Sequence, residues 1–167
     1  SVGATRVDNG VYVASEHAHV DDLRAAYRRV LLSLAADDLT SDDPEGFMPE
    51  VGRRIADLVD ATLEAGLALA RRDIDPSGRI PFAIIAMGKT GARELNYISD
   101  VDVVYVAEAG ADGDEREALE VATRLAAATA SACSGPGTEA PLWTVDANLR
   151  PEGRNGALVR TVDSYRQ

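Results

Sequence analysis

The sequence predicts an α+β domain in which an N-terminal helical segment precedes a small mixed β-sheet with flanking helices. Three observations predict this class. Apolar residues recur with the helical period through residues 21–75, short runs rich in β-branched residues follow, and an Ala-rich segment of helical length separates the last two runs. We therefore divide the chain into a polar segment at 1–20, a helical segment at 21–75 that packs on the core, and an α+β core at 76–167.

The helical segment is expected to form two helices. One face of the first carries Leu23, Tyr27, Val30, Leu31 and Leu34, at spacings of three and four residues. The stretch DDLTSDDPEG then interrupts the pattern, and we expect the second helix to begin near Pro49. Its apolar stripe consists of Ile55, Leu58, Val59, Leu63, Leu67 and Ala70. Before these helices, only NGVYVAS is a candidate strand.

The core is expected to contain three main strands and one long helix. The continuous apolar run IPFAIIAM (80–87) predicts a buried strand, and DVDVVYVAE (100–108) predicts a second one. Between them, residues 88–99 should form a loop with a helical turn. A helix is expected at 115–132, a flexible loop at 134–141 and a third strand in LWTVDANL (142–149). A turn at 150–156 then leads to a further strand or helix.

Composition excludes several classes of function. The chain has 17 Lys and Arg against 28 Asp and Glu, a net charge of −11. This acidity argues against nucleic acid and against an anionic membrane surface, since both need a basic footprint. No apolar run approaches a membrane span of about 18 residues, and no secretory signal is present. The single cysteine, Cys133, excludes an internal disulfide and should be unreactive, so a cytoplasmic location is the simplest one.

The triplet Gly88-Lys89-Thr90 matches the end of a P-loop. A P-loop also needs a glycine five residues before Gly88, where this chain has Ala83. Residues 83–87 belong to the predicted apolar strand, so no loop remains to surround phosphates. We therefore reject a P-loop.

Three aspartates lie at apolar strand positions. Asp100 and Asp102 are two residues apart, so in a strand they point to the same face, roughly 7 Å from each other. Two partly desolvated like charges repel unless a cation lies between them, and carboxylate oxygens suit Mg²⁺. Asp146 lies in the third strand, and three converging carboxylates could hold two ions for phosphoryl or nucleotidyl transfer. The alternative is that Asp100 and Asp102 are solvated acids at a strand end.

The motifs around these acids resemble a known family. The pattern G-K-x-G, then S-D-x-D, then a third Asp on a later strand resembles the DNA polymerase β-type nucleotidyltransferase superfamily. Lys89 departs from the Ser usual in that turn. The stretches AMGKTGARELNYISDVDVVYV and VDANLRPEGRNGALVRT together resemble the glutamine synthetase adenylyltransferase family, also called glutamate–ammonia-ligase adenylyltransferase. The best matches cover residues 81–108 and 143–160. Residues 76–167 would then be the nucleotidyltransferase catalytic core.

The resemblance implies a set of site residues. Asp100, Asp102 and Asp146 would be the catalytic and metal-binding carboxylates, holding two Mg²⁺ ions, which Mn²⁺ could replace. The residues expected to line the nucleotide phosphate are Gly88, Lys89, Ser99, Arg150 and Arg154. The alternative for Arg150 is a salt bridge with Glu152 or another nearby acid.

Enzymes of this family have two similar catalytic halves. One attaches AMP from ATP to a tyrosine of glutamine synthetase, and the other removes it with orthophosphate, giving ADP. Asn96, Tyr97 and the sequence SDVD indicate the N-terminal, adenylyl-removing half. The adenylylated glutamine synthetase would be the protein substrate, and the PII signal protein would act through the full-length enzyme. Two alternatives remain: adenylyl transfer from ATP, and a non-catalytic module that binds nucleotide or a regulator.

The two ends of the chain suggest a piece of a longer protein. The sequence begins without Met and stops at DSYRQ without a helix-ending signal. We therefore expect a fragment whose catalytic core is truncated at its C-terminal end.

Overall fold

Strand β4 (Val101–Ala107) is the centre of a four-stranded sheet. It pairs antiparallel with β3 (Phe82–Ala86) on one side, and parallel with β5 (Val145–Asp146) and β6 (Val159–Arg160) on the other. This computed structural model describes residues 4–7, 10–110 and 113–166. The sheet is therefore small and mixed, which confirms the predicted α+β class.

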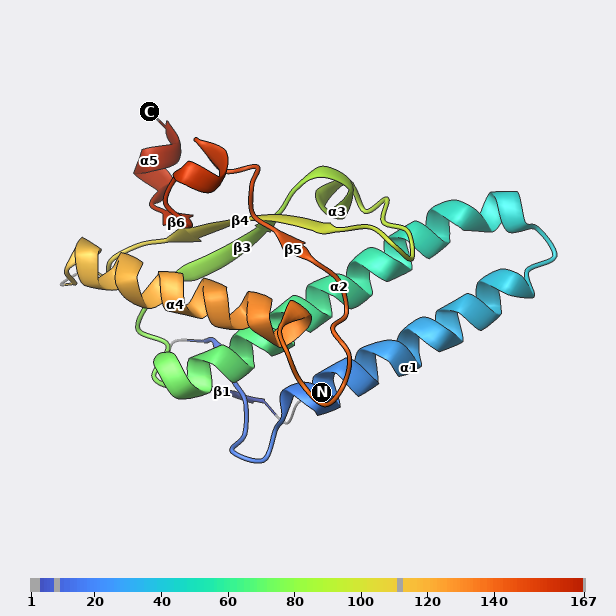
Figure 1. Ribbon diagram of the computed structural model, residues 1–167, viewed down its shortest axis with the longest axis horizontal. Helices are drawn as coiled ribbons and strands as arrows, with labels where there is room; N and C mark the ends of the chain where they lie inside the picture. Colours follow the sequence, from blue (N-terminus) through green and yellow to red (C-terminus); the bar gives the residue numbers. More distant parts are fainter. Residues whose placement is uncertain (1–3, 8–9, 111–112, 167) are drawn as a thin grey trace.

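Three long helices lie on one side of this sheet (Figure 1). Helix α2 (Pro44–Ile74) packs against both α1 (Val20–Leu39) and α4 (Glu115–Ser134). Three short helical turns lie on the opposite side: α3 (Gly88–Ala92), η1 (Gly153–Asn155) and α5 (Val162–Arg166). A hairpin of β1 (Thr5–Arg6) and β2 (Tyr12–Val13) precedes α1, and β2 contacts α2.

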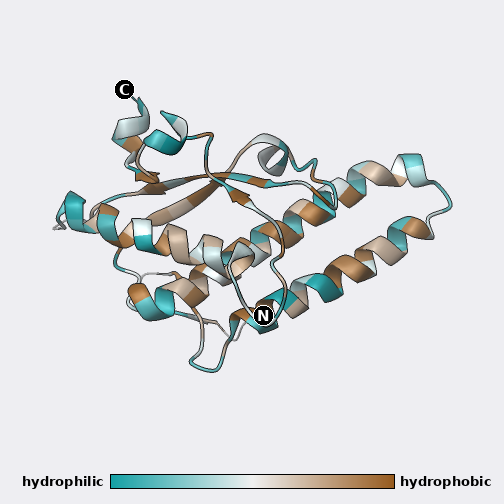
Figure 2. Ribbon diagram, in the orientation of Figure 1, coloured by the Kyte–Doolittle hydropathy of each residue, from teal (hydrophilic) through white to brown (hydrophobic). Residues whose placement is uncertain are grey.

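The main core lies between the sheet and the long helices. Val103 and Tyr105 of β4 are buried there against Ile55 and Val59 of α2. The strands of the sheet are largely apolar parts of the ribbon (Figure 2). Because side chains alternate along a strand, Asp102 lies on the sheet face turned away from these helices. The core therefore lies against one face of β4, and the Asp102 side chain lies on the other face.

Two helical predictions need correction. Helix α2 begins at Pro44, not near Pro49, because Asp43 caps it: the Asp43 carboxylate accepts a hydrogen bond from the Gly46 amide (3.1 Å). Proline is favoured in the first turn, while Pro49 is tolerated inside the helix near its start. On α1, Val30 is 52% exposed and lies outside the buried face, although Leu23, Tyr27 and Leu34 are buried.

Two strand predictions also need correction. Strand β3 is an edge strand, not a buried one: its burial alternates, and Ala83 and Ile85 point to solvent. An apolar run does not reveal whether a neighbouring strand covers its second face. The third strand, β5, is reduced to two residues, since β4 pairs with it only at Val145 and Asp146.

A buried arginine fixes the loop that follows α4. Arg24 of α1 is fully buried, and its guanidinium donates to the carbonyls of Ser131, Ala132, Gly135 and Glu139 at 2.8–3.1 Å. These carbonyls belong to the C-terminal end of α4 and the loop beyond it, where helical acceptors are unpaired. The loop predicted to be flexible is therefore fastened to α1.

Cys133 is fully buried on α4, and burial raises the pKa of its thiol to about 12. Since the thiolate is the reactive form, this agrees with the prediction that Cys133 is unreactive. Within the described ranges, none of the helices has the length and apolarity needed to cross a bilayer.

A buried ion pair joins the end of α2 to the start of β3. Arg71 and Asp75 have side chains only 2% and 1% exposed, and Arg71 Nη1 lies 2.6 Å from Asp75 Oδ2. The Asp75 carboxylate also accepts the amides of Arg79 and Ile80. Burial lowers the pKa of Arg71, and the Asp75 charge opposes that shift. The pair therefore fixes the turn that delivers β3 to the sheet.

We expect Asp75→Asn to lower the free energy of unfolding by roughly 3–5 kcal/mol, because Arg71 would stay buried without a counter-charge. Urea denaturation monitored by circular dichroism measures this. Glu120→Gln is the matched control, since it breaks the Arg116–Glu120 pair, whose side chains are 86% and 66% exposed. That change should cost less than about 1 kcal/mol. Equal effects of the two substitutions would contradict a role for the buried pair.

Candidate active site

Two of the predicted acids lie side by side on neighbouring strands. Asp102 of β4 and Asp146 of β5 are Cα partners in a parallel pair. Partners in such a pair point to the same face, about 4.8 Å apart at the backbone. Both residues are half-buried. The structure therefore brings Asp102 and Asp146 together on the face turned away from the long helices.

The backbone of Asp102 is tied to the glycine turn that follows β3. Its carbonyl accepts a hydrogen bond from the Met87 amide (2.9 Å), and its amide donates to the Thr90 hydroxyl oxygen (3.2 Å). Thr90 is 2% exposed. In the sequence, Thr90 stands out only as the end of the rejected P-loop pattern, so its structural role was not predicted. Since β3 runs to Ala86 and α3 starts at Gly88, no P-loop is present, as predicted.

Gly88 contacts the Asp102 carboxylate. Its φ of +50° lies in the left-handed region, which glycine adopts without strain. A Cβ at this position would lie 2.6 Å from Asp102 Oδ2. Only glycine therefore leaves free space beside that oxygen. This space is where an ion or a phosphate oxygen could approach the carboxylate.

A pocket of about 520 Å³ opens beside this contact. Its lining consists of Gly88, Lys89, Asn96, Ile98, Ser99, Asp100 and Asp102. Four of the predicted site residues in addition to Asp102 thus share one pocket. The residues at 93–100, which connect α3 to β4 and which we call the site loop, provide the outer wall.

Asn96 shapes the site loop. Its side-chain oxygen accepts hydrogen bonds from the Ser99 hydroxyl and the backbone amide of Ile98, both at 3.0 Å, and its own backbone amide donates to Ser99 Oγ (3.2 Å). Ser99 is therefore held in a closed turn next to Asp100. The sequence signal was an Asn three residues before Ser-Asp, where an Asx turn is favoured, but Asn96 was not predicted to line the site.

The three carboxylates do not form a closed ligand set. Asp100 is exposed and precedes β4, and Asp146 Oδ1 accepts the Asn148 amide (2.7 Å). Across residues 4–7, 10–110 and 113–166, no three His, Cys, Asp or Glu side chains are gathered so that they could hold a metal. The paired Asp102 and Asp146, with the open space at Gly88, nonetheless offer oxygen donors that suit a hard divalent cation.

The predicted arginines have different surroundings. Arg150 donates to the carbonyls of Ala147 (2.6 Å) and Gly156 (3.3 Å), so it stabilises its own turn. The salt bridge considered for Arg150 is not formed with Glu152, which pairs with Arg160 at 3.1 Å. Arg154 is exposed in η1. Neither predicted arginine lines the pocket.

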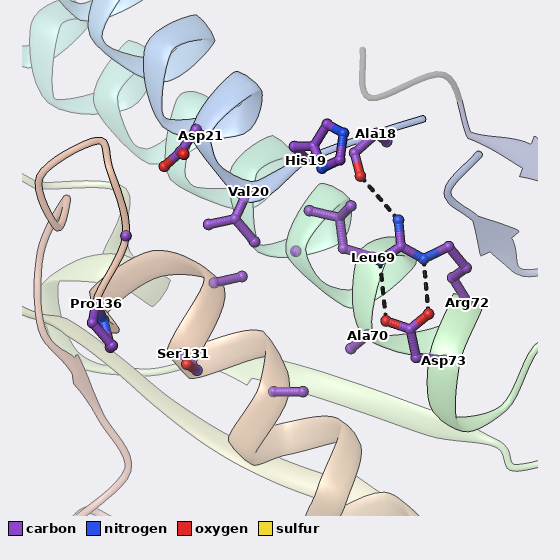
Figure 3. Close-up of a pocket in the computed structure, with 14 residues that line it drawn as sticks. Ala18, His19, Val20, Asp21, Leu69, Ala70, Arg72, Asp73, Ser131 and Pro136 are labelled. Carbon is purple, nitrogen blue, oxygen red and sulfur yellow. Dashed lines mark hydrogen bonds and ion pairs between the residues drawn. The ribbon is translucent and has the colours of Figure 1, made fainter. Parts of the chain in front are cut away.

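A second pocket of about 500 Å³ lies among the long helices (Figure 3). Its floor is formed by small and apolar residues of α2 and α4, including Leu69 and Ala70. Arg72 at its edge is paired with Asp73 and donates to the Ala18 carbonyl. None of the predicted site residues lines this pocket, so the candidate active site is the one at Asp102.

Comparison with known proteins places the chain in a family. A family model described as glutamate-ammonia ligase adenylyltransferase matches residues 5–167. Proteins from Leifsonia xyli, Cutibacterium acnes and Streptomyces coelicolor are 50%, 51% and 51% identical over 92%, 87% and 86% of this chain. Each is named bifunctional glutamine synthetase adenylyltransferase/adenylyl-removing enzyme, and the matched parts are 16%, 15% and 14% of their lengths. The chain therefore belongs to the glutamate–ammonia ligase adenylyltransferase family.

Proposed function

We propose that this chain forms an adenylyl-removing site that acts on adenylylated glutamine synthetase. The observation that carries the proposal is that Asp102 pairs with Asp146 on one side and lies beside the Gly88 turn on the other. Two carboxylates on one sheet face, one of them next to a turn without a side chain, suit the binding of Mg²⁺ and a phosphate group together. The names of the relatives, which describe both adenylyl transfer and removal, support the same chemistry.

The proposed reaction is phosphorolysis. An oxygen of orthophosphate attacks the phosphorus of the tyrosyl-AMP, the bond from that phosphorus to the tyrosine oxygen breaks, and the tyrosine oxygen takes the proton of the attacking phosphate. The products are ADP and unmodified glutamine synthetase. Positioning and electrostatic stabilisation are sufficient for such a transfer, so no covalent protein intermediate is needed.

The residues have separate proposed roles. Asp102 and Asp146 would hold the divalent ions, two Mg²⁺ or Mn²⁺, and Asp100, which lines the pocket with Asp102, is the proposed third carboxylate. Ions bound there would offset charge on the attacking and leaving oxygens. Lys89 lines the pocket and supplies positive charge for a phosphate, and Gly88 lets the backbone approach it. Ser99 provides a hydroxyl at the same wall. Arg154, which is exposed, would reach the substrate from η1.

The removal reaction is favoured over transfer by the residues around the site. Asn96, Tyr97 and the sequence SDVD resemble the adenylyl-removing half of the family, and Asn96 lines the pocket. Adenylyl transfer from ATP would use the same carboxylates and remains the alternative outcome of the test below. We propose that the reaction takes place in the cytoplasm and that the PII signal protein acts through the longer enzyme.

The assay should use the complete natural protein that carries this chain, with Asp102→Asn as the site variant. We expect the variant to lose ADP formation from adenylylated glutamine synthetase and orthophosphate, and to keep incorporation of AMP from ATP into the unmodified enzyme. Asp163→Asn, which changes an acid that is 82% exposed on α5, should leave both reactions intact. Loss of AMP incorporation alone would assign transfer to this site, and loss of neither reaction would indicate a non-catalytic module.

Metal binding can be tested without turnover. Mg²⁺ or Mn²⁺ should raise the thermal midpoint of this chain, because a ligand that binds only the folded state stabilises it. The shift should disappear in Asp102→Asn and persist in Asp163→Asn. In chelator, Asp102→Asn should be at least as stable as the unchanged chain, since it removes a like charge beside Asp146. An equal shift in both variants would contradict the proposed metal site.

Gly88→Ala tests whether the free space beside the Asp102 carboxylate is needed for metal binding. Its Cβ would collide with Asp102 Oδ2 at 2.6 Å, so we expect the metal-induced stabilisation to be lost. Gly153→Ala is the matched control: its φ of +55° imposes the same backbone strain, of about 1–2 kcal/mol. Its Cβ, however, meets nothing closer than 3.6 Å. Thermal melts with and without Mn²⁺ measure both. Retention of the shift in Gly88→Ala would show that the space beside Asp102 is not needed.

A further inference from the structure

The site loop lies directly on helix α2. Gly52 of α2 has no side chain, and a Cβ there would lie 3.3 Å from the Leu95 carbonyl oxygen and 3.4 Å from that of Arg93. Leu95 itself is 4% exposed and belongs to the main core. The backbone of the loop thus rests on the helix at a point where any side chain would press against it.

A second contact joins the start of the site loop to α2. Arg93 ends α3 with a φ of +60°, and its guanidinium forms ion pairs with Asp57 and, at 3.5 Å, with Asp60. Desolvation raises the pKa of Asp60, and the Arg93 charge opposes that shift. These side chains are half-exposed, so each ion pair contributes little energy. Their effect is to fix the direction in which the chain leaves α3.

A third contact joins the middle of the loop to α1. The Tyr97 hydroxyl donates to Asp38 Oδ2 at 2.8 Å. Next to it, Asp37 of α1 pairs with Arg54 of α2 at 2.9 Å, so the two helices are linked at the same place. Burial and the Asp38 carboxylate raise the pKa of Tyr97 to about 12. The phenol therefore stays protonated, and able to donate, throughout the neutral range.

We propose that α1 and α2, which we call the helical hairpin, hold the site loop in position for nucleotidyl transfer, with Gly52 and Tyr97 as positioning residues. The inference rests on the proposed function. Only Ile98, Ser99 and Asp100 separate Tyr97 from β4, and the turn closed by Asn96 and Ser99 makes this stretch stiff. A displacement of Tyr97 therefore also displaces Asp100. The position of Asp100 relative to Asp102 depends on the helical hairpin.

The first test compares two alanine substitutions in the same helix. Gly52→Ala pushes against loop backbone at 3.3–3.5 Å, whereas the Cβ of Gly66→Ala meets ordinary contacts at 3.6 Å on α4. We expect Gly52→Ala to weaken Mn²⁺ binding to this chain on the order of 10-fold, because small misplacements of site groups are costly. Gly66→Ala should bind Mn²⁺ as the unchanged chain does. Titration well below the thermal midpoint, with circular dichroism to confirm folding, measures the affinity.

The second test removes the hydrogen bond between Tyr97 and Asp38 by changing either partner. Tyr97→Phe and Asp38→Ala should each reduce kcat for ADP formation in the complete protein on the order of 10-fold and leave KM for the protein substrate unchanged. The double variant should lose no more than either single one, since residues acting through one bond are not additive. Asp42→Ala, which removes a nearby exposed carboxylate, is the matched control and should behave as the unchanged protein does.

The outcomes separate the two proposals. If the unchanged protein binds Mn²⁺ and forms ADP, while Gly52→Ala and Tyr97→Phe match their controls, the positioning role is overturned and the proposed function stands. If the unchanged protein neither binds Mn²⁺ nor forms ADP, the proposed function is overturned and this inference with it. Should one variant fail to fold, the other decides, because the two perturb the loop from different helices.

Discussion

The structure depends on how firmly the backbone of Asp102 is held. Its backbone amide donates to the Thr90 hydroxyl, and its carbonyl accepts the Met87 amide, so both are bonded to the Gly88 turn. Strand β5 pairs with Asp102 from the other side. The Thr90 hydroxyl is buried, so water cannot replace it as the acceptor, and an unpaired amide there would be costly. Three elements distant in sequence therefore meet at one residue. The carboxylate is presented from a backbone that has little freedom to move.

The two faces of β4 have different roles. One face buries Val103 and Tyr105 against α2 and carries the main core. The other face presents Asp102 next to Asp146. A strand is suited to this division because neighbouring side chains point in opposite directions. Apolar packing on one side can thus stabilise the fold while acids remain on the other, where they are available to a cation and a phosphate.

Two buried arginines stabilise the fold of this acidic chain. Arg24 and Arg71 are almost completely buried in a protein with a net charge of −11. Arg24 satisfies the carbonyls at the end of α4, and Arg71 binds the carboxylate of Asp75, which follows α2. The planar guanidinium can donate in several directions at once, which a lysine cannot do as rigidly. Both arginines fix the ends of elements that frame the sheet, so they act on the site only through the fold.

The class of fold, the main strand and the candidate acids could be predicted from the sequence alone. The β-branched run at 100–108 predicted β4, the helical period predicted the two leading helices, and the motifs around Asp100, Asp102 and Asp146 predicted the family that the comparisons confirm. These features are local: periodicity, β propensity and motif spacing are properties of short stretches of chain. The roles of the acids and of the metal stay predictions.

Which of these residues lie next to each other could not be predicted, because it depends on how distant segments pack. The register that pairs Asp102 with Asp146 joins positions 44 residues apart in sequence (146 − 102), and no local pattern specifies it. The exposed side of β3, the buried position of Arg24 and the contact of Gly52 with the site loop likewise depend on neighbours from distant segments. Arg150 has the residue type that binds phosphate, yet its hydrogen bonds go to its own turn. The physical reason is that burial and hydrogen-bond partners are set by packing between elements, which a single sequence does not contain as a local signal.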